Sequence, residues 1–198
     1  MIPRRVVIAT SNPGKVRELG ALIAEWGDVE VLSLADVPGV ALPEETGATY
    51  RENALVKAVA VAHATGLPAL ADDSGLEVDA LDGAPGVASA RYAPSDEERI
   101  AKLLGSLAGV AGPARTAAFG CAVVLAWPDG RIEAAAGRCA GRIAVAPSGS
   151  EGFGYDAIFE PDESGRTLGT MTPAEKARVS HRARAMRTLG GRLERTCG

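Results

Sequence analysis

A short apolar segment that runs directly into a polar loop and a helix constrains the fold more than any other feature of this sequence. Residues 6–9 are rich in β-branched side chains and bounded by turn formers, which indicates a buried strand in a sheet covered on both faces. Asn12 and Pro13 suit the N-cap and the first position of a helix. The helix then carries one apolar stripe, made of Val16, Leu19, Ile23 and Trp26. Strand, loop and helix in this order indicate an α/β fold.

The rest of the chain continues this alternation. Further strands are expected at residues 29–32, 67–71, 76–78, 116–127 and 131–136. Capping-box patterns predict helices beginning after Thr49, Ser95 and Thr172, and a final helix runs from Ser180 to about residue 189. The helix after Thr49 is expected to turn Leu55, Val59 and Ala62 inward. Since no repeat, low-complexity tract or linker interrupts the chain, residues 1–198 are expected to form a single domain.

Composition narrows the classes of partner and compartment. The 198 residues carry a formal net charge of −4, so the basic field of a nucleic-acid-binding protein is not expected. No apolar stretch approaches the ~20 residues of a membrane span, and no secretory segment is expected at the N-terminus. Cys121, Cys139 and Cys197 are odd in number and far apart, which favours neither disulfides nor zinc. This cysteine usage suits a reducing cytoplasm.

Residues 10–15 form the first candidate binding segment. They follow a buried strand, where open α/β sheets bind their ligands. The backbone donors of a helix N-terminus and the ammonium of Lys15 suit polyphosphate oxygens. The segment is no Walker A loop, because Val16 follows Lys15 and no glycine stands at the required offset. On these residues alone, an ordinary capped turn is an equally good interpretation.

Two acidic pairs form the second candidate. Asp72 and Asp73 follow an apolar segment, and successive strand residues point to opposite faces, so one carboxylate is expected in a site and the other in a structural role. Glu44 and Glu45 precede a helix. One of them, with Asp73, would supply the one or two carboxylates that Mg²⁺ takes beside substrate phosphates. The alternatives are a solvated turn for the Asp pair and compensation of the helix dipole for the Glu pair.

The third candidate is a glycine-rich segment at residues 152–156 with nearby cationic side chains. Glycines on both sides of Phe153 let a flat ligand approach, and its ring can stack on a base. Lys176, His181 and Arg182 are hydrogen-bond donors for an anionic ligand. The remaining basic residues of the last helix are expected to be solvated: Arg184, Arg187, Arg192 and Arg195.

In combination these segments resemble the inosine/xanthosine triphosphate pyrophosphatase family, the non-canonical purine NTP pyrophosphatases. The matching segments follow the order of that family and cover most of the chain: residues 8–15, 44–47, 52–54, 71–76, 83–87, 89–92, 152–156 and 180–182. Each segment alone is a weak indicator of the family, whereas the whole set in this order is a specific one. Ser11 stands where glycine is frequent and Tyr50 where phenylalanine is, and neither departure removes a catalytic group.

The resemblance implies an activity and an architecture. The activity is Mg²⁺-dependent hydrolysis of ITP, dITP and XTP to the monophosphate and pyrophosphate, with water attacking the α-phosphorus. The architecture is an elongated two-lobed α/β fold around a twisted mixed β-sheet with flanking helices, with the active site in the cleft between the lobes. The resemblance also implies a homodimer.

Individual roles follow from the same resemblance. Asp73 matches the proton acceptor and a metal ligand, and Glu44 is preferred as the second ligand, with Glu45 as the near alternative. The triphosphate is assigned to Thr10, Ser11, Asn12, Pro13, Gly14 and Lys15. The other positions that match substrate-binding residues are Ser74, Phe153, Gly154, Tyr155, Asp156, Lys176, His181 and Arg182.

Base selection has a separate physical logic. Hypoxanthine and xanthine present an oxygen at position 6 where adenine presents an amino group, so the donors Lys176, His181 and Arg182 would accept the former and leave adenine unpaired. Two alternatives stay open: a pyrophosphatase for pyrimidine or modified nucleoside triphosphates, and a nucleotide-binding module without turnover. A nucleic-acid-binding role for the basic C-terminal helix is least favoured, because the remainder of the chain is acidic.

Overall fold

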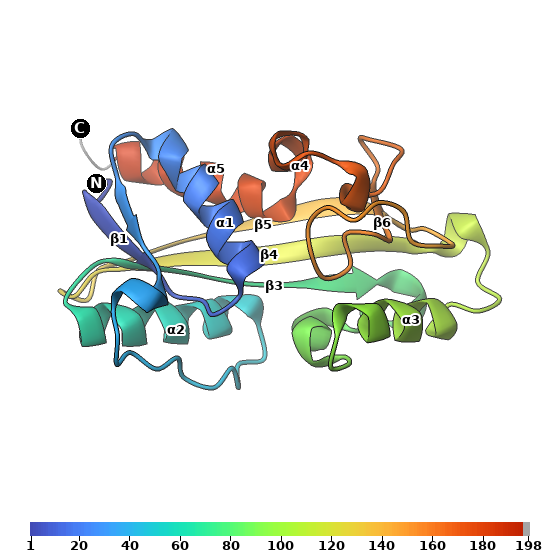
Figure 1. Cartoon of the computed structure of the whole chain (residues 1–198), viewed down its shortest axis with the longest axis horizontal. Helices are drawn as coiled ribbons and strands as arrows, with labels where there is room; N and C mark the ends of the chain where they lie inside the picture. Colours follow the sequence, from blue (N-terminus) through green and yellow to red (C-terminus); the bar gives the residue numbers. More distant parts are fainter. Residues whose placement is uncertain (196–198) are drawn as a thin grey trace. The chain divides into compact units, whose positions relative to one another are not determined.

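The computed structural model describes residues 1–195, so Cys197 lies outside the described residues. Its sheet has the strand order β2-β1-β3-β4-β5-β6 (Figure 1). β1 (Arg5–Ile8) runs parallel to both β2 (Glu30–Leu32) and β3 (Ala69–Val78). Next come β4 (Thr116–Ala126), β5 (Ile132–Ile143) and β6 (Phe159–Pro161), of which β6 is antiparallel to β5. The α/β fold with a mixed sheet and flanking helices is thereby confirmed.

The helices begin at the caps that the sequence predicts. α1 (Pro13–Ile23) has Asn12 as N-cap, and α2 (Tyr50–Thr65) and α4 (Pro173–Val179) begin with complete capping boxes. α3 (Asp96–Ser106) begins after Ser95, whose hydroxyl accepts a hydrogen bond from the amide of Glu98. α5 (His181–Arg195) runs about one and a half turns beyond the predicted end.

Contacts divide the chain into two compact units. The first unit comprises Met1–Asp73, Cys121–Gly137 and the chain from Arg182 onward. The second unit comprises Ser74–Gly120 and Arg138–His181. The boundaries fall within β3, β4 and β5, so these strands contribute residues to both units.

In the first unit the sheet is covered on both faces, as the apolar character of β1 predicts. Val7 and Ala69 pack with residues of α2 on one face, while α1 and α5 lie on the other (Figure 1). The buried apolar face of α2 consists of Ala54, Ala58, Val61 and Ala62. The prediction that Val59 points inward is wrong: this residue is 43% exposed, because the face of α2 against the strands is formed by Val61 and by three alanines.

The second unit has its own core. It contains Leu76, Leu103, Phe119 and Phe159, and the rings of Phe119 and Phe159 meet edge to face at 4.8 Å. The guanidinium of Arg115 donates to three backbone carbonyls, those of Leu107, Val110 and Ala144. It thus satisfies carbonyls just beyond the C-terminal end of α3.

The predicted break between two strands is wrong. Residues 67–71 and 76–78 are not separate strands with a polar turn between them, because β3 is continuous from Ala69 to Val78 and carries Asp72 and Asp73 in its middle. Ion pairs and hydrogen bonds satisfy both carboxylates there, so the strand continues through them. β6 lacks any local signal and forms through its pairing with β5.

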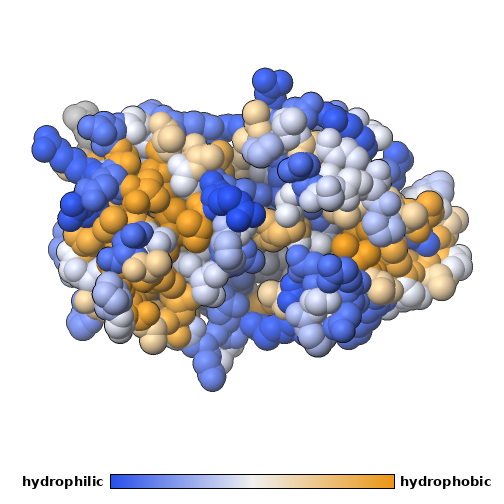
Figure 2. Space-filling model, in the orientation of Figure 1, coloured by the Kyte–Doolittle hydropathy of each residue, from blue (hydrophilic) through white to orange (hydrophobic). Residues whose placement is uncertain are grey.

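The surface mixes apolar and hydrophilic side chains on the face shown in Figure 2. The large exposed apolar residues of the first unit include Val31, Val56 and Val59. Among residues 1–195, no helix is both long enough and apolar enough to traverse a lipid bilayer.

Candidate active site

The polar loop between β1 and α1 is built around the side chain of Asn12. Its Oδ1 accepts hydrogen bonds from the amides of Gly14 at 2.8 Å and Lys15 at 3.2 Å. Thr10 is buried, and its hydroxyl accepts from the amide of Asn12 at 3.2 Å. Ser11, Asn12 and Pro13 are exposed, so the loop presents the positive end of α1 to solvent.

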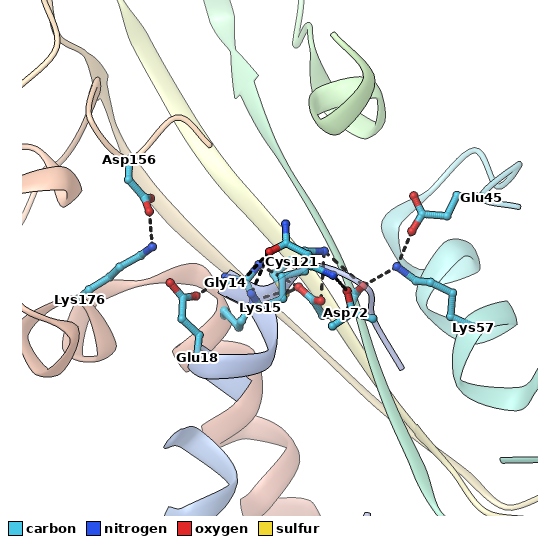
Figure 3. A network of polar contacts seen from close by, with 12 residues as sticks. Gly14, Lys15, Glu18, Glu45, Lys57, Asp72, Cys121, Asp156 and Lys176 are labelled. Carbon is cyan, nitrogen blue, oxygen red and sulfur yellow. Dashed lines mark hydrogen bonds and ion pairs between the residues drawn. The ribbon is translucent and has the colours of Figure 1, made fainter. Parts of the chain in front are cut away.

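Asp72 is the centre of a buried charge network in the first unit (Figure 3). One carboxylate oxygen lies 3.1 Å from Nζ of Lys15, and the other accepts from Nε and Nη2 of Arg182 at 2.9 Å each. The thiol of Cys121 approaches the same carboxylate at 4.0 Å. Burial alone would raise the pKa of Asp72, but the positive charges of Lys15, Arg182 and Lys57 outweigh it and hold this pKa well below the usual range. Asp72 therefore stays ionised and fixes two cations.

Lys57 lies on the α2 side of this network. The residue is only 3% exposed, and its ammonium donates to Oε1 of Glu45 at 2.5 Å and to the backbone carbonyl of Asp72 at 2.8 Å. Figure 3 shows the ammonium between these two partners. Lys57 thus ties the acidic loop before α2 to the middle of β3.

Asp73 lies in a different electrostatic environment from Asp72. Its side chain is almost fully buried, and Oδ2 accepts one hydrogen bond from Nδ2 of Asn53 at 2.9 Å. Burial raises the pKa of Asp73, the charge of Glu45 adds to this effect, and the hydrogen bond from Asn53 with the charges of Lys15 and Lys57 offsets only part of it. Burial therefore disfavours the ionised carboxylate, and an added cation would stabilise it.

The donor set suits a hard divalent cation. Among residues 1–195 no cluster of three or more His, Cys, Asp or Glu side chains has the arrangement of a complete metal cage. Mg²⁺ does not need such a cage, because it takes one or two carboxylates together with phosphate oxygens and water. Asp73 supplies one carboxylate. Glu45 is partly buried and acts electrostatically on Asp73, whereas Glu44 is exposed.

In the second unit, the loop at residues 152–156 is held by its own side chains. The carboxylate of Asp156 accepts from the amide of Phe153 at 2.8 Å and pairs with the ammonium of Lys176. That ammonium also lies 4.9 Å from the centre of the Phe153 ring, and Figure 3 shows it facing Asp156. Gly152 has a φ of +81°, and a Cβ there would collide with Oδ2 of Asp156, so only glycine fits.

Two further contacts anchor the same loop. Oδ2 of Asp96, at the start of α3, accepts from the amide of Gly154 at 2.7 Å. The hydroxyl of Tyr155 donates to the carbonyl of Ser89 at 3.1 Å. Tyr155 and Asp156 are buried, while Phe153 and Gly154 are partly exposed. The loop is therefore held in place by hydrogen bonds to side chains and to the backbone, while its first residues lie at the surface.

The remaining predicted residues divide between the two units. Ser74 is half-buried in the second unit, where the ring of His181 also stacks on Phe119 with centroids 4.7 Å apart. Arg182 belongs to the first unit, is 1% exposed, and pairs with Glu18 as well as with Asp72. The first unit thus brings together Lys15, Arg182 and the two aspartates.

Comparison with known proteins decides the family. A sequence profile described as the Ham1 family matches residues 6–191. The chain belongs to the Ham1 family. The Ham1 chain is 51% identical to the dITP/XTP pyrophosphatase of Deinococcus deserti over 190 residues, which cover 94% of this chain and 88% of that protein. It is 53% identical to a protein of the same name from Thermus thermophilus over 187 residues, which cover 93% and 89%.

A solved structure of a HAM1 protein from Coxiella burnetii matches with a TM-score of 0.85 at 39% identity, covering 96% of this chain and 98% of that one. The similarity extends over the whole fold. The predicted family resemblance of this Ham1 chain is therefore confirmed.

Sequence reasoning missed two buried polar residues of the Ham1 site, Asn53 and Lys57. They stand four positions apart on α2, in the same stripe as Ala54 and Ala58. An amide and an ammonium within an otherwise small and apolar helix face were the available signal, because buried polar groups need partners.

Proposed function

We propose that this Ham1 chain hydrolyses the deaminated purine nucleoside triphosphates ITP, dITP and XTP to the monophosphate and pyrophosphate. The observation that carries the proposal is the contrast between two adjacent buried carboxylates: Asp72 pairs with the cations Lys15 and Arg182, while Asp73 accepts a hydrogen bond from the neutral amide of Asn53. A base and an organised set of cations next to one another suit hydrolysis of a phosphoanhydride. The names of the related proteins support this substrate class.

The polyphosphate is assigned to the loop before α1. Backbone amides at a helix N-terminus and the ammonium of Lys15 attract phosphate oxygens, and Asn12 keeps this turn in shape. Thr10, Ser11, Pro13 and Gly14 complete the cradle. Asp73, with Glu44 or Glu45, would hold Mg²⁺, and the bound ion would supply positive charge to offset the charge on the phosphate groups.

Asp73 is assigned as the proton acceptor. The oxygen of a water molecule bonds to the α-phosphorus while the bond from that phosphorus to the bridging oxygen of pyrophosphate breaks, and a proton of the water passes to Asp73.

The base is assigned to donors and to one aromatic ring. Lys176 and His181 are proposed to donate to the 6-oxygen, with Phe153 stacking on the ring system and Ser74, Gly154, Tyr155 and Asp156 completing the pocket. The guanidinium of Arg182 is paired with Asp72 and Glu18. We propose that Arg182 acts on the substrate through the positive charge of this ion-pair network. Adenine, which presents an amino group in place of the 6-oxygen, would offer these donors no acceptor.

The domain organisation, oligomeric state and cellular compartment are proposed from other observations. We propose that residues 1–198 act as one catalytic domain that forms a homodimer, for which the exposed apolar Val31, Val56 and Val59 are candidate contact residues. The buried thiols of Cys121 and Cys139 suit the cytoplasm. Neither a nucleic acid nor a membrane is proposed as a partner.

Pyrophosphate release is the direct test. Purified protein is incubated with ITP, dITP, XTP, dUTP, ATP or GTP, with Mg²⁺ and with excess chelator. Fast Mg²⁺-dependent release from the first three is expected. Preference for dUTP would favour a pyrimidine enzyme, and tight ITP binding without release would favour a binding module. Equal turnover of ATP and ITP would overturn the proposed base selection.

A further inference from the structure

Asn53 is a buried amide whose two polar atoms serve two different parts of the first unit. Its side chain is fully inaccessible to solvent. Nδ2 donates to Oδ2 of Asp73 at 2.9 Å, and Oδ1 accepts from the backbone amide of Gly47 at 2.8 Å. One side chain on α2 thus connects the loop that carries Glu44 and Glu45 to the carboxylate in the middle of β3.

The chemistry of the two partners fixes the orientation of this amide. The amide of Gly47 is a donor and requires Oδ1, while the carboxylate of Asp73 is an acceptor and requires Nδ2. A rotation of the amide by 180° would place like groups against each other on both sides. Asn53 therefore constrains the carboxylate of Asp73 from a fixed direction.

Close packing reinforces the contact with the loop. A Cβ at position 47 would lie 2.7 Å from Oδ1 of Asn53 and 3.1 Å from its backbone nitrogen. Only a residue without a side chain lets the loop backbone approach the amide this closely. The fit of Gly47 to Asn53 is a second observation that the loop and the amide form one unit.

One helical turn further along α2, Lys57 makes a parallel bridge. It joins the side chain of Glu45 to the backbone carbonyl of Asp72, while Asn53 joins the backbone of Gly47 to the side chain of Asp73. The two bridges hold the acidic loop at two points against two successive residues of β3. This arrangement fixes where the loop carboxylates lie with respect to Asp73.

We propose that Asn53 is a positioning residue that orients the carboxylate of Asp73 and fixes the acidic loop beside it for binding a divalent cation. The inference rests on the proposed role of Asp73 as proton acceptor and metal ligand. Groups that orient metal ligands through hydrogen bonds typically change metal affinity or activity by about 10- to 100-fold when they are removed.

Two variants break the contact from opposite sides. Asn53→Leu keeps the side-chain volume and removes both hydrogen bonds, and Gly47→Ala displaces the loop while leaving Asn53 in place. Arg51→Gln, an exposed change in the first turn of the same helix, is the matched control. For each protein, kcat and KM for ITP are measured, together with Mn²⁺ affinity of the nucleotide-free protein by electron paramagnetic resonance and the melting temperature without metal.

Asn53→Leu is expected to lower kcat by about 10- to 100-fold and to weaken Mn²⁺ binding by about 10-fold or more, with KM for ITP changed less than either. Gly47→Ala is expected to change both quantities in the same direction. The double variant should lose less than the two single changes added together, because both remove one contact. Arg51→Gln should match the wild type.

The inference is overturned if both folded variants keep wild-type Mn²⁺ affinity, whatever happens to kcat, since Asn53 would then have only a packing role. Additive losses in the double variant would also overturn it. If Asn53→Leu does not fold, Gly47→Ala decides the question through the same measurements. Absence of pyrophosphate release by the wild type would instead contradict the proposed function, while the Mn²⁺ affinities would still test Asn53.

Discussion

Nζ of Lys15 lies 3.1 Å from a carboxylate oxygen of Asp72 that is fully shielded from solvent. The lysine of the proposed phosphate loop is therefore already held by an anion at the centre of the sheet. Arg182 contacts the other oxygen of the same carboxylate. Asp72 thus holds together two cations that lie near opposite ends of the sequence. We infer that its role is to position these charges.

This ion-pair network predicts a large loss of stability when Asp72 is neutralised. Asp72→Asn leaves the buried guanidinium of Arg182 with less compensating charge, and removing one partner of a buried pair costs about 3–5 kcal/mol. The free energy of unfolding in urea measures the effect. Asp129→Asn, which breaks the exposed pair with Arg131, is the control and should cost far less, because solvent screens that pair. Equal losses for the two variants would contradict the assignment.

Neutralising Asp73 is expected to lower turnover without lowering the stability of the fold. Asp73→Asn should lower turnover of ITP by about 100-fold or more, because the proton acceptor is removed. Its free energy of unfolding at neutral pH should stay the same or rise, because burial raises the pKa of Asp73 and its ionised form is the costly one in the fold.

The turnover of ITP by Asp73→Asn, Glu44→Gln and Glu45→Gln is measured at increasing Mg²⁺ concentrations. A Glu variant that recovers turnover at high Mg²⁺ identifies the second metal ligand. Near-normal turnover by Asp73→Asn at saturating Mg²⁺ would show that the proton acceptor is another group.

Features set by short stretches of chain were predictable, and features set by distant partners were not. Asn12, Thr49 and Thr172 cap helices as expected because each bonds to amides two or three residues away. The pairing of Arg182 with Asp72 spans 110 positions, and no local pattern encodes it. The same applies to Asn53, whose partners lie on a loop and on a strand.

The continuity of β3 shows most directly why contacts between distant residues could not be predicted from the sequence. Two adjacent aspartates in a sequence indicate a turn, because isolated buried carboxylates are costly. In the fold, Lys15 and Asn53 provide partners for them, which offsets part of that cost. Only the three-dimensional arrangement reveals these partners, so the expected turn is replaced by strand.

The capping box of α4 predicts a pH-dependent contribution to stability. A backbone hydrogen bond from Thr172, and then side-chain bonds from Arg166 and Thr172, lower the pKa of Glu175 to about 2. Because the folded pKa is depressed, this contribution is present above the ordinary glutamate range and is lost as the pH falls toward about 2.

The melting temperatures of wild type and Glu175→Gln should therefore differ at about pH 6 and converge as the pH is lowered. Glu97→Gln, an exposed change in the first turn of α3, is the control and should alter the melting temperature at about pH 6 less than Glu175→Gln does. A difference between wild type and Glu175→Gln that stays constant down to about pH 2.5 would contradict the role of the carboxylate in the cap.

Two successive glycines in α5 predict opposite outcomes for the same substitution. A Cβ at Gly190 would lie 2.7 Å from Nε1 of Trp26, whereas a Cβ at Gly191 would come no closer than 3.7 Å to Nη1 of Arg195. Alanine within a helix is about 0.5–1 kcal/mol more favourable than glycine. Gly191→Ala should therefore raise the free energy of unfolding by about that amount.

Gly190→Ala gains the same backbone preference but forces the indole of Trp26 away from its contact with α5. Overpacking of this kind costs about 1–3 kcal/mol, so the net effect should be a loss of stability. Trp26→Phe provides the control, because its smaller ring should relieve most of the loss caused by Gly190→Ala and leave the effect of Gly191→Ala unchanged. Chemical unfolding of the single variants, and of each alanine variant combined with Trp26→Phe, measures this coupling. If both alanines stabilise the protein equally, the packing of Trp26 against α5 is looser than the distances indicate.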